Sequence, residues 1–198
     1  WSALNDHNFF ELSWALDRHN GFLDHFIPQT FVGNHDVTRL ASCLEDAGAL
    51  EQALAVLFTV GGIPSVYAGD EQAFHGVKTE GEGGDDAVRP AFPDSPQGLW
   101  PDGWTVYRRH QELIGVRRRH PWLVRAHTKV LRLENTRLLL ELAHDERRLF
   151  LALNLDGPAS FAVPEAKTVL AGRDAHFSGA GSLHLGAKGW AILSTAQC

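Results

Sequence analysis

Apolar residues recur every three or four positions in three stretches of this chain, and that spacing marks one face of an α-helix. The pattern predicts helices over residues 8–20, 48–60 and 104–119. Asn8 is a suitable N-cap for the first helix, and Glu11 follows at the right distance to complete a capping box. Pro121 is expected to end the third helix. On the inward face of that helix we expect Val106, His110, Leu113 and Ile114.

Short apolar runs between these helices predict two strands, at residues 30–33 and 63–67. Helix, strand, helix, strand is the order of a parallel α/β sheet. A polar loop, residues 69–102, separates the second strand from the third helix. After Pro121 the pattern changes to short strands divided by turn residues, which is typical of an antiparallel β module. The strands of this module are expected at residues 130–134, 138–142, 149–155, 160–163, 168–170 and 190–193.

The chain has 198 residues, 44% of them hydrophobic, which suffices for one sizeable core or two small ones. A net charge of −6 argues against nucleic acid and against an anionic membrane as partners. No apolar run approaches the length of a membrane span, and the first residues lack the pattern of a secretory signal. Cys43 and Cys198 are too few for a disulfide framework, so we expect free thiols and a cytoplasmic location.

The residue pattern predicts no metal and no other cofactor in this chain. The eleven histidines form no Cys/His cluster and no His-x-x-x-His pair, so zinc is not expected. Acidic residues gather at 80–86, but their spacing is not that of an EF-hand, and we expect a solvated loop. The basic run at residues 117–120 closes a helix, where cations suit the helix dipole, and is not expected to bind nucleic acid.

The most informative stretch lies at residues 31–36. An apolar run ends in Gly33, and Asn34, His35 and Asp36 follow, three polar side chains that can engage a sugar. Polar residues at the carboxyl end of a barrel strand are where TIM barrels carry their chemistry. The hexapeptide Phe-Val-Gly-Asn-His-Asp resembles the fourth conserved region of the α-amylase family of glycoside hydrolases. A second motif, Gly-Ile-Pro-Ser-Val-Tyr-Ala-Gly-Asp-Glu at residues 62–71, resembles the last barrel strand of that family.

This resemblance implies an α/β part followed by an all-β part. Residues 1–120 would be the C-terminal part of a (β/α)8 TIM barrel, from its sixth to its eighth helix, and residues 121–198 an antiparallel β-sandwich domain. The implied activity is retaining hydrolysis of α-glucosidic bonds, or transglycosylation, with α-glucan or oligosaccharide as substrate. The chain contains no methionine, so we expect it to be a piece of a longer protein.

The family places its nucleophile Asp on the fourth barrel strand and its acid/base Glu on the fifth, and neither strand has a counterpart here. We therefore expect the 198-residue chain alone to be inactive, because bond cleavage needs both groups. A calcium site in the missing part of the parent remains open. The unpaired barrel strands are expected to be covered by the N-terminal part of the parent barrel or by a second copy of the chain.

Each polar residue near the hexapeptide receives a role from the resemblance. Asp36 would be the third carboxylate, which stabilises the transition state, with His35 and Asn34 as substrate-binding neighbours. Arg39 completes Asn-His-Asp-x-x-Arg and would donate to a substrate hydroxyl or to a site carboxylate; the alternative is a surface Arg. For Glu71 we expect a hydrogen bond that ties down its loop. The alternative for Asn34 and Asp36 is that they merely end a strand and cap the next segment.

Some features stay open on sequence alone. Residues 86–92 resemble an Asp-x-x-Arg-x-Pro segment of the family but depart from it by one residue, so their role is undecided. Trp100 and Trp104 could stack on sugar rings or pack at the start of the last helix. The alternative function is a non-catalytic carbohydrate-binding or regulatory module that reuses the fold. An open reading frame that continues upstream with the missing strands would exclude this alternative.

Overall fold

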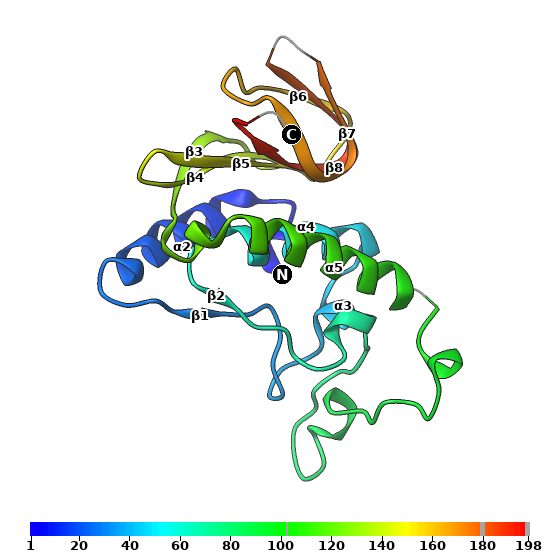
Figure 1. Ribbon diagram of the computed structural model, residues 1–198. Coiled ribbons are helices and arrows are strands. Elements are labelled where there is room, and N and C mark those ends of the chain that lie inside the picture. Colours follow the sequence, from blue (N-terminus) through cyan, green and yellow to red (C-terminus); the bar gives the residue numbers. More distant parts are fainter. Residues whose placement is uncertain (102, 179–180, 197–198) are drawn as a thin grey trace.

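The computed structural model describes residues 1–101, 103–178 and 181–196 (Figure 1). Cys198, one of the two expected free thiols, lies outside the described residues, and Cys43 is a half-buried free thiol. No helix of the described chain is both long and apolar enough to cross a membrane. The helices are α1 Ser2–Asn5, α2 Phe9–Leu23, α3 Leu40–Cys43, α4 Ala47–Thr59 and α5 Gly103–Arg119.

The three predicted helices are confirmed as α2, α4 and α5, with small changes at their ends. Asn8 caps α2 as expected, since its side chain accepts a hydrogen bond from the Phe10 N–H at 3.0 Å. Glu11 does not complete the capping box; it accepts from the Ser2 hydroxyl at 2.5 Å instead. The helix also continues past Gly21 to Leu23, and Gly21 does not adopt the positive φ of a helix-ending glycine.

Helix α5 buries one face, with one exception to the predicted set. Val106, His110 and Leu113 are buried, whereas Ile114 is 38% exposed, so its inward placement was wrong. The neighbouring Leu113 already occupies the buried direction, and successive helical residues point about 100° apart. The inward face continues instead to Arg117.

Arg117 belongs to the basic run but is buried, unlike a solvated helix end. Its guanidinium donates to the carbonyl oxygens of Phe58, in the last turn of α4, and of Val60 and Gly62, which follow that helix. Burial lowers the pKa of Arg117 to about 10, which leaves it charged at neutral pH. This arginine thus joins the end of α4 to α5.

Two short strands pair in parallel, as the helix–strand–helix–strand pattern predicts. Strand β1 is Gln29–Thr30 and strand β2 is Ile63–Pro64, with Gln29 opposite Ile63. Both are shorter than predicted. The pair is flanked by hydrogen bonds from the Ile63 N–H to the Pro28 carbonyl and from the Ser65 N–H to the Thr30 carbonyl, each 2.8 Å. Beyond Thr30 the chain leaves the ladder and enters the Gly33–Asp36 turn.

The remaining strands form a curled antiparallel sheet (Figure 1). Its order is β3-β4-β5-β8-β6, and β7 pairs with β8 as well. Strands β7 and β8 run for 11 and 13 residues and are much longer than predicted, because their exposed polar residues and two register shifts hide the alternation. The strands are β3 His127–Leu133, β4 Arg137–His144, β5 Arg147–Asn154, β6 Ala159–Ala162, β7 Thr168–Ser178 and β8 Ser182–Ser194.

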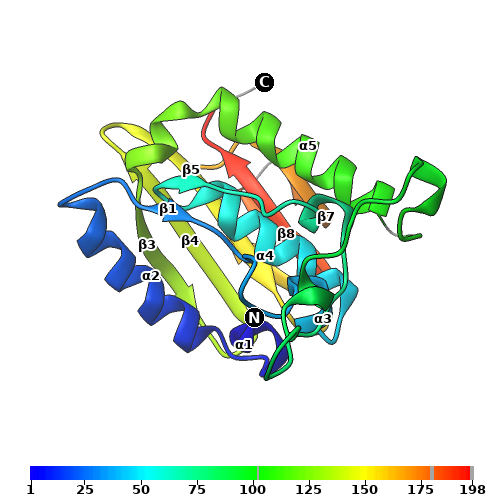
Figure 2. The ribbon, with the colours of Figure 1, turned by 90° about the horizontal axis from the view of Figure 1, so that it is seen from below.

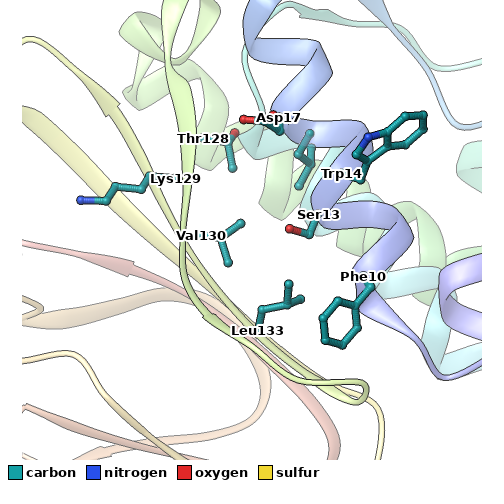
Figure 3. Close-up of a pocket in the computed structure, with 9 residues that line it drawn as sticks. Phe10, Ser13, Trp14, Asp17, Thr128, Lys129, Val130 and Leu133 are labelled. Atoms are coloured by element: carbon teal, nitrogen blue, oxygen red, sulfur yellow. The ribbon is translucent and has the colours of Figure 1, made fainter.

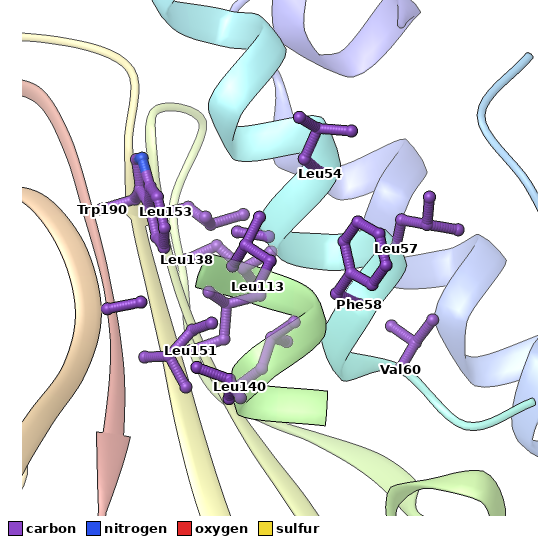
Figure 4. Close-up of a cluster of buried hydrophobic side chains, with 14 of the residues drawn as sticks. Leu54, Leu57, Phe58, Val60, Leu113, Leu138, Leu140, Leu151, Leu153 and Trp190 are labelled. Carbon is purple, nitrogen blue, oxygen red and sulfur yellow. The ribbon is translucent and has the colours of Figure 1, made fainter. Parts of the chain in front are cut away.

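The sheet has a hydrophobic core on each face. On one face, α2, α4 and α5 lie across the strands (Figure 2). Figure 4 shows Leu54 and Phe58 of α4 and Leu113 of α5 in one cluster with Leu140 and Trp190 of the sheet. The other face forms a second core within the curled sheet, built from Leu139, Phe150, Phe161, Val163, Leu183 and Leu193. The expected domain boundary near residue 120 therefore divides elements that share one hydrophobic core.

Candidate functional site

The three polar residues of the hexapeptide follow β1 in a tight turn. The side-chain oxygen of Asn34 accepts the Asp36 N–H at 2.8 Å, an Asx-type turn that fixes the direction in which Asp36 points. The side chains of His35 and Asp36 are 62% and 57% exposed, and His35 Nε2 lies 3.1 Å from Asp36 Oδ2. Asn34 thus shapes the turn, while His35 and Asp36 present polar atoms to the surroundings.

Arg89 joins this turn to a distant loop. Its Nη2 donates to Asp36 Oδ1 at 3.0 Å, and its Nε donates to the His35 carbonyl oxygen at 3.0 Å. The same guanidinium reaches Asp85 Oδ2 at 2.7 Å, and Lys78 Nζ lies 2.6 Å from the other oxygen of Asp85. The Lys78 ammonium holds the pKa of the Asp85 carboxyl below its usual range. Two carboxylates and two cations therefore alternate along this edge.

Sequence reasoning missed this role of Arg89. The signal was present in residues 86–92, which resemble a family segment containing an Asp-x-x-Arg motif. The acidic residues 80–86 form a loop in which Asp85 takes part in ion pairs. Across residues 1–101, 103–178 and 181–196, no group of three or more His, Cys, Asp or Glu side chains is arranged to hold a metal ion.

The Asp36 side chain lines a hollow of about 580 Å³. Apolar side chains and the polar ends of Lys78 and Glu80 share its wall, a mixture that suits a ligand with hydroxyl groups on an apolar ring. The hollow is wide open on the described part of the chain. Its lining consists of Trp1, Val32, Asp36, Val37, Thr38, Leu40, Cys43, Lys78 and Glu80.

A second hollow, between α2 and β3, differs in character (Figure 3). Phe10, Val130 and Leu133 face the gap between helix and strand, while the Trp14 indole and the Lys129 ammonium point away from it. No ion pair comparable to that of Asp36 and Arg89 joins the labelled side chains across the gap. The hollow at Asp36 is therefore the stronger candidate for a functional site.

Arg39 lies beneath the site and not at the surface. Its side chain is 2% exposed, so the surface alternative was wrong. Nη1 donates to Asp70 Oδ1 and to the Ala68 carbonyl oxygen, both at 2.8 Å, and Nε donates to the Val88 carbonyl oxygen at 2.8 Å. The guanidinium also stacks on the Tyr67 ring, 4.0 Å from its centre. The carboxylate that Arg39 reaches is thus Asp70.

Asp70 is buried between Arg39 and the backbone at Gly33. Burial raises the pKa of the Asp70 carboxyl, and the hydrogen bond from Arg39 opposes that rise. Its Oδ2 atom has no hydrogen-bond partner among the described residues. A Cβ atom placed on Gly33 would lie 2.5 Å from this oxygen, so only glycine leaves room for the carboxylate there.

The remaining candidates pack locally. Glu71 accepts the Gly69 N–H at 2.9 Å, which confirms that it ties down its own loop. Trp100 lies against His75, with 5.0 Å between ring centres, and is about half exposed. Trp104 meets Tyr107 edge to face at 5.9 Å and is likewise about half exposed. Neither indole lines the hollow at Asp36.

Comparisons with known proteins point to one family. A model of the alpha amylase catalytic domain matches residues 2–95, a range that contains both motifs and Arg89. The chain is 28% identical over 134 residues to cyclomaltodextrin glucanotransferase of Paenibacillus macerans, and 31% identical over 136 residues to that of Niallia circulans. These matches cover 68% and 67% of the chain but only 17% of each relative. The chain thus spans about a sixth of the length of these curated relatives.

Among solved structures, the trehalulose synthase MutB from Pseudomonas mesoacidophila MX-45 has the same fold over most of the chain. The TM-score is 0.78 at 17% sequence identity, and the match covers 94% of this chain and 46% of MutB. At this identity the likeness concerns the fold alone. The family model over residues 2–95, the matches to the two glucanotransferases and the two motifs support the chain as a fragment of an alpha-amylase family protein.

Proposed function

We propose that the protein acts on α-glucosidic bonds of α-glucans or oligosaccharides, as a retaining glycoside hydrolase or transglycosylase, and that Asp36 stabilises its transition state. One observation carries the proposal: Asp36 lies exposed at the edge of the hollow, held between His35 and Arg89 in the turn that follows β1. Similarity to the alpha-amylase family supports the general kind of reaction. The names of the two relatives, both glucanotransferases, support a glucan as the substrate.

The proposed chemistry follows from charge. Retaining cleavage passes through an oxocarbenium-like transition state, in which positive charge develops on the sugar ring. A fixed carboxylate such as Asp36 stabilises that charge and accepts hydrogen bonds from ring hydroxyls. His35 lies beside it as a second sugar contact, and Asn34 holds the turn. For Arg39 we now propose a positioning role, because its contacts are to Asp70 and to carbonyl groups.

Hydrolysis also needs a nucleophile and an acid/base, which we place in parts of the protein outside these 198 residues. The chain spans only 17% of the length of each glucanotransferase, and this supports the placement. In the same proposal, residues 1–120 are the C-terminal part of a (β/α)8 barrel and residues 121–198 a β-sandwich domain. The parallel pairing of β1 and β2 and the likeness to MutB support the first half of this division.

The proposed partners of the chain are its substrate and a polypeptide that covers β1 and β2. Each of these strands pairs only with the other in the described chain, and each therefore keeps one open edge. Phe31 and Ile63, beside and within them, are more than half exposed. The N-terminal part of the parent barrel is the proposed cover, with a second copy as the alternative.

The test is Asp36→Asn in the protein that carries the whole barrel. The change keeps the side-chain volume and removes the charge, so kcat should fall by a factor of about 100 to 1,000 with little change in KM. Release of reducing sugar from starch and maltooligosaccharides gives the rate, and near-UV circular dichroism reports folding. Asp145→Asn, the same chemical change in the exposed turn between β4 and β5, is the matched control.

Normal turnover in the Asp36→Asn variant would contradict the proposed role. Sugar binding without turnover in the protein with the whole barrel would favour the non-catalytic module instead. The 198-residue chain alone should release no reducing sugar under the same conditions. Activity that co-purifies with this chain would contradict the placement of the nucleophile and the acid/base elsewhere.

A further inference from the structure

We propose that Arg39 and Asp70 are positioning residues, which hold Arg89 against Asp36 and so set the place of the carboxylate in the site. The two side chains form a buried ion pair of 2.8 Å and are 2% and 7% exposed. A buried pair of this kind is costly to form. Arg39 also donates to the Ala68 and Val88 carbonyl groups, whereas Asp70 Oδ2 has no hydrogen-bond partner among the described residues. The contacts of this pair lead to both sides of the His35–Asp36 turn.

The first branch runs from Arg39 to Arg89. Arg39 Nε donates to the carbonyl oxygen of Val88, the residue directly before Arg89, and the Val88 side chain is fully buried. The peptide unit that carries Arg89 is therefore fixed at its start. From there the guanidinium of Arg89 reaches the His35 carbonyl and the Asp36 carboxylate. Arg39 thus fixes the backbone of the cation that contacts Asp36.

The second branch runs from Asp70 to Gly33. The Oδ2 atom of Asp70 lies where a side chain of Gly33 would be, so the carboxylate packs directly on the backbone where the turn after β1 begins. Gly33 is the residue before Asn34, whose side chain closes the turn that orients Asp36. The Arg39–Asp70 ion pair therefore contacts the backbone beside both partners: Arg39 bonds the residue before Arg89, and Asp70 packs on the glycine before the turn that carries Asp36.

Arginine is required at position 39 by geometry and not by charge alone. Three acceptors surround its guanidinium: the Asp70 carboxylate and the carbonyl groups of Ala68 and Val88. The planar fork of donors reaches all three through Nη1 and Nε, whereas a lysine ammonium at the place of Nη1 can bond the carboxylate and the Ala68 carbonyl but has no counterpart of Nε for Val88. Arg39→Lys keeps the buried charge and removes the bond to Val88, so it separates positioning from ion pairing.

The experiment uses the 198-residue chain with ¹⁵N-labelled arginine and measures solvent exchange of the Arg89 Nε–H. In the wild type this proton is bonded to the His35 carbonyl. Arg39→Lys should speed its exchange at least tenfold, because Arg89 is no longer held in place. Arg132→Lys is the matched control: Arg132 also pairs with a carboxylate, donates to a carbonyl and stacks on a ring, through Glu134, Ser160 and Phe161.

Unchanged Arg89 exchange in a folded Arg39→Lys chain would overturn the proposal, as would equal acceleration by Arg132→Lys. If Arg39→Lys does not fold, Asp70→Asn provides the test, since it keeps an oxygen that Arg39 can bond. A smaller acceleration of Arg89 Nε–H exchange in this variant would support the proposal. Unchanged exchange would overturn it. Failure of both variants to fold would make the pair a general structural element and would also overturn it.

The consequence for catalysis rests on the proposed function. In the protein with the whole barrel, Arg39→Lys should lower kcat by more than it raises KM, because Asp36 acts in the transition state. The two proposals fail separately. Full activity of Asp36→Asn would remove the proposed function and leave the exchange result intact, whereas unchanged Arg89 exchange would remove only the positioning role.

Discussion

At Gly33 the missing side chain decides where a carboxylate of the site can lie. The Asp70 oxygen occupies the space that a Cβ would fill, 2.5 Å from its ideal position. Gly21 is the opposite case, because it lies within α2 and has no neighbour within 4 Å of that position. The same substitution at the two glycines should therefore have opposite effects.

Gly33→Ala should lower the free energy of unfolding by about 1–3 kcal/mol, since the added methyl group displaces the buried Asp70 carboxylate. Gly21→Ala should raise it by about 0.5–1 kcal/mol, since alanine favours the helix and restricts the unfolded chain. Urea unfolding followed by tryptophan fluorescence measures both. Equal shifts in the two variants would contradict the packing described at Gly33.

At the scale of elements, α5 carries a buried histidine between α4 and the loop after β2. The His110 Nδ1 atom is bonded to the Val106 carbonyl at 2.9 Å, and its ring meets Phe58 edge to face at 5.8 Å. Its Nε2 atom has no hydrogen-bond partner within the described chain. Burial lowers the pKa of His110, and the Val106 carbonyl, Glu71 and Asp70 oppose that change.

This lowered pKa predicts how stability depends on pH. Below the ordinary histidine pKa of 6.5, the unfolded chain takes up a proton at this position that the folded chain resists. The unfolded state then binds more protons, so stability falls as the pH drops through that value toward the folded-state pKa. Above pH 6.5, His110 is neutral in both states, and this loss of stability is absent.

His110→Phe should remove this part of the pH dependence, because the ring keeps its contact with Phe58 and no longer titrates. Free energies of unfolding in urea, measured from pH 7.5 down to pH 5, should therefore fall more steeply for the wild type than for the variant. His25→Phe, at an exposed position, is the control. Parallel curves for wild type and His110→Phe would contradict the assignment.

At the scale of the whole molecule, the two parts of the chain differ in how completely they are covered. The curled sheet has a core on each face, one of them shared with α2, α4 and α5. The β1–β2 pair has open edges on both sides in the described chain, and Phe31 and Ile63 lie exposed beside them. Open parallel strands with apolar neighbours favour association.

We therefore expect the isolated 198-residue chain to self-associate or to retain a companion fragment. Sedimentation velocity should show a concentration-dependent increase in mass, and mass spectrometry identifies any companion. Ile63→Lys should weaken the association, because it places a charge on the open pair. Leu131→Lys, at an exposed position on β3, should not. A compact monomer without a companion at all concentrations would contradict this expectation.

Most of the secondary structure and both motifs can be predicted from the sequence alone. The helices α2, α4 and α5 follow from apolar spacing and from caps such as Asn8, because helix formation depends on residues three and four apart. The six antiparallel strands follow from alternation and turn residues, although β7 and β8 were underestimated where polar residues interrupt the pattern. Both motifs of the alpha-amylase family are continuous in sequence and needed no structure.

The tertiary structure alone decided which charges meet. Arg89 lies 53 positions from Asp36, and Arg39 lies 31 positions from Asp70, and each pair depends on the path of the long loop after β2. The burial of Arg117 depends likewise on where α4 ends against α5. Local propensity carries no information about such approaches, because they result from the packing of whole elements. The sequence thus carried both motifs and the place of Asp36 after β1, and the fold determined which residues contact Asp36.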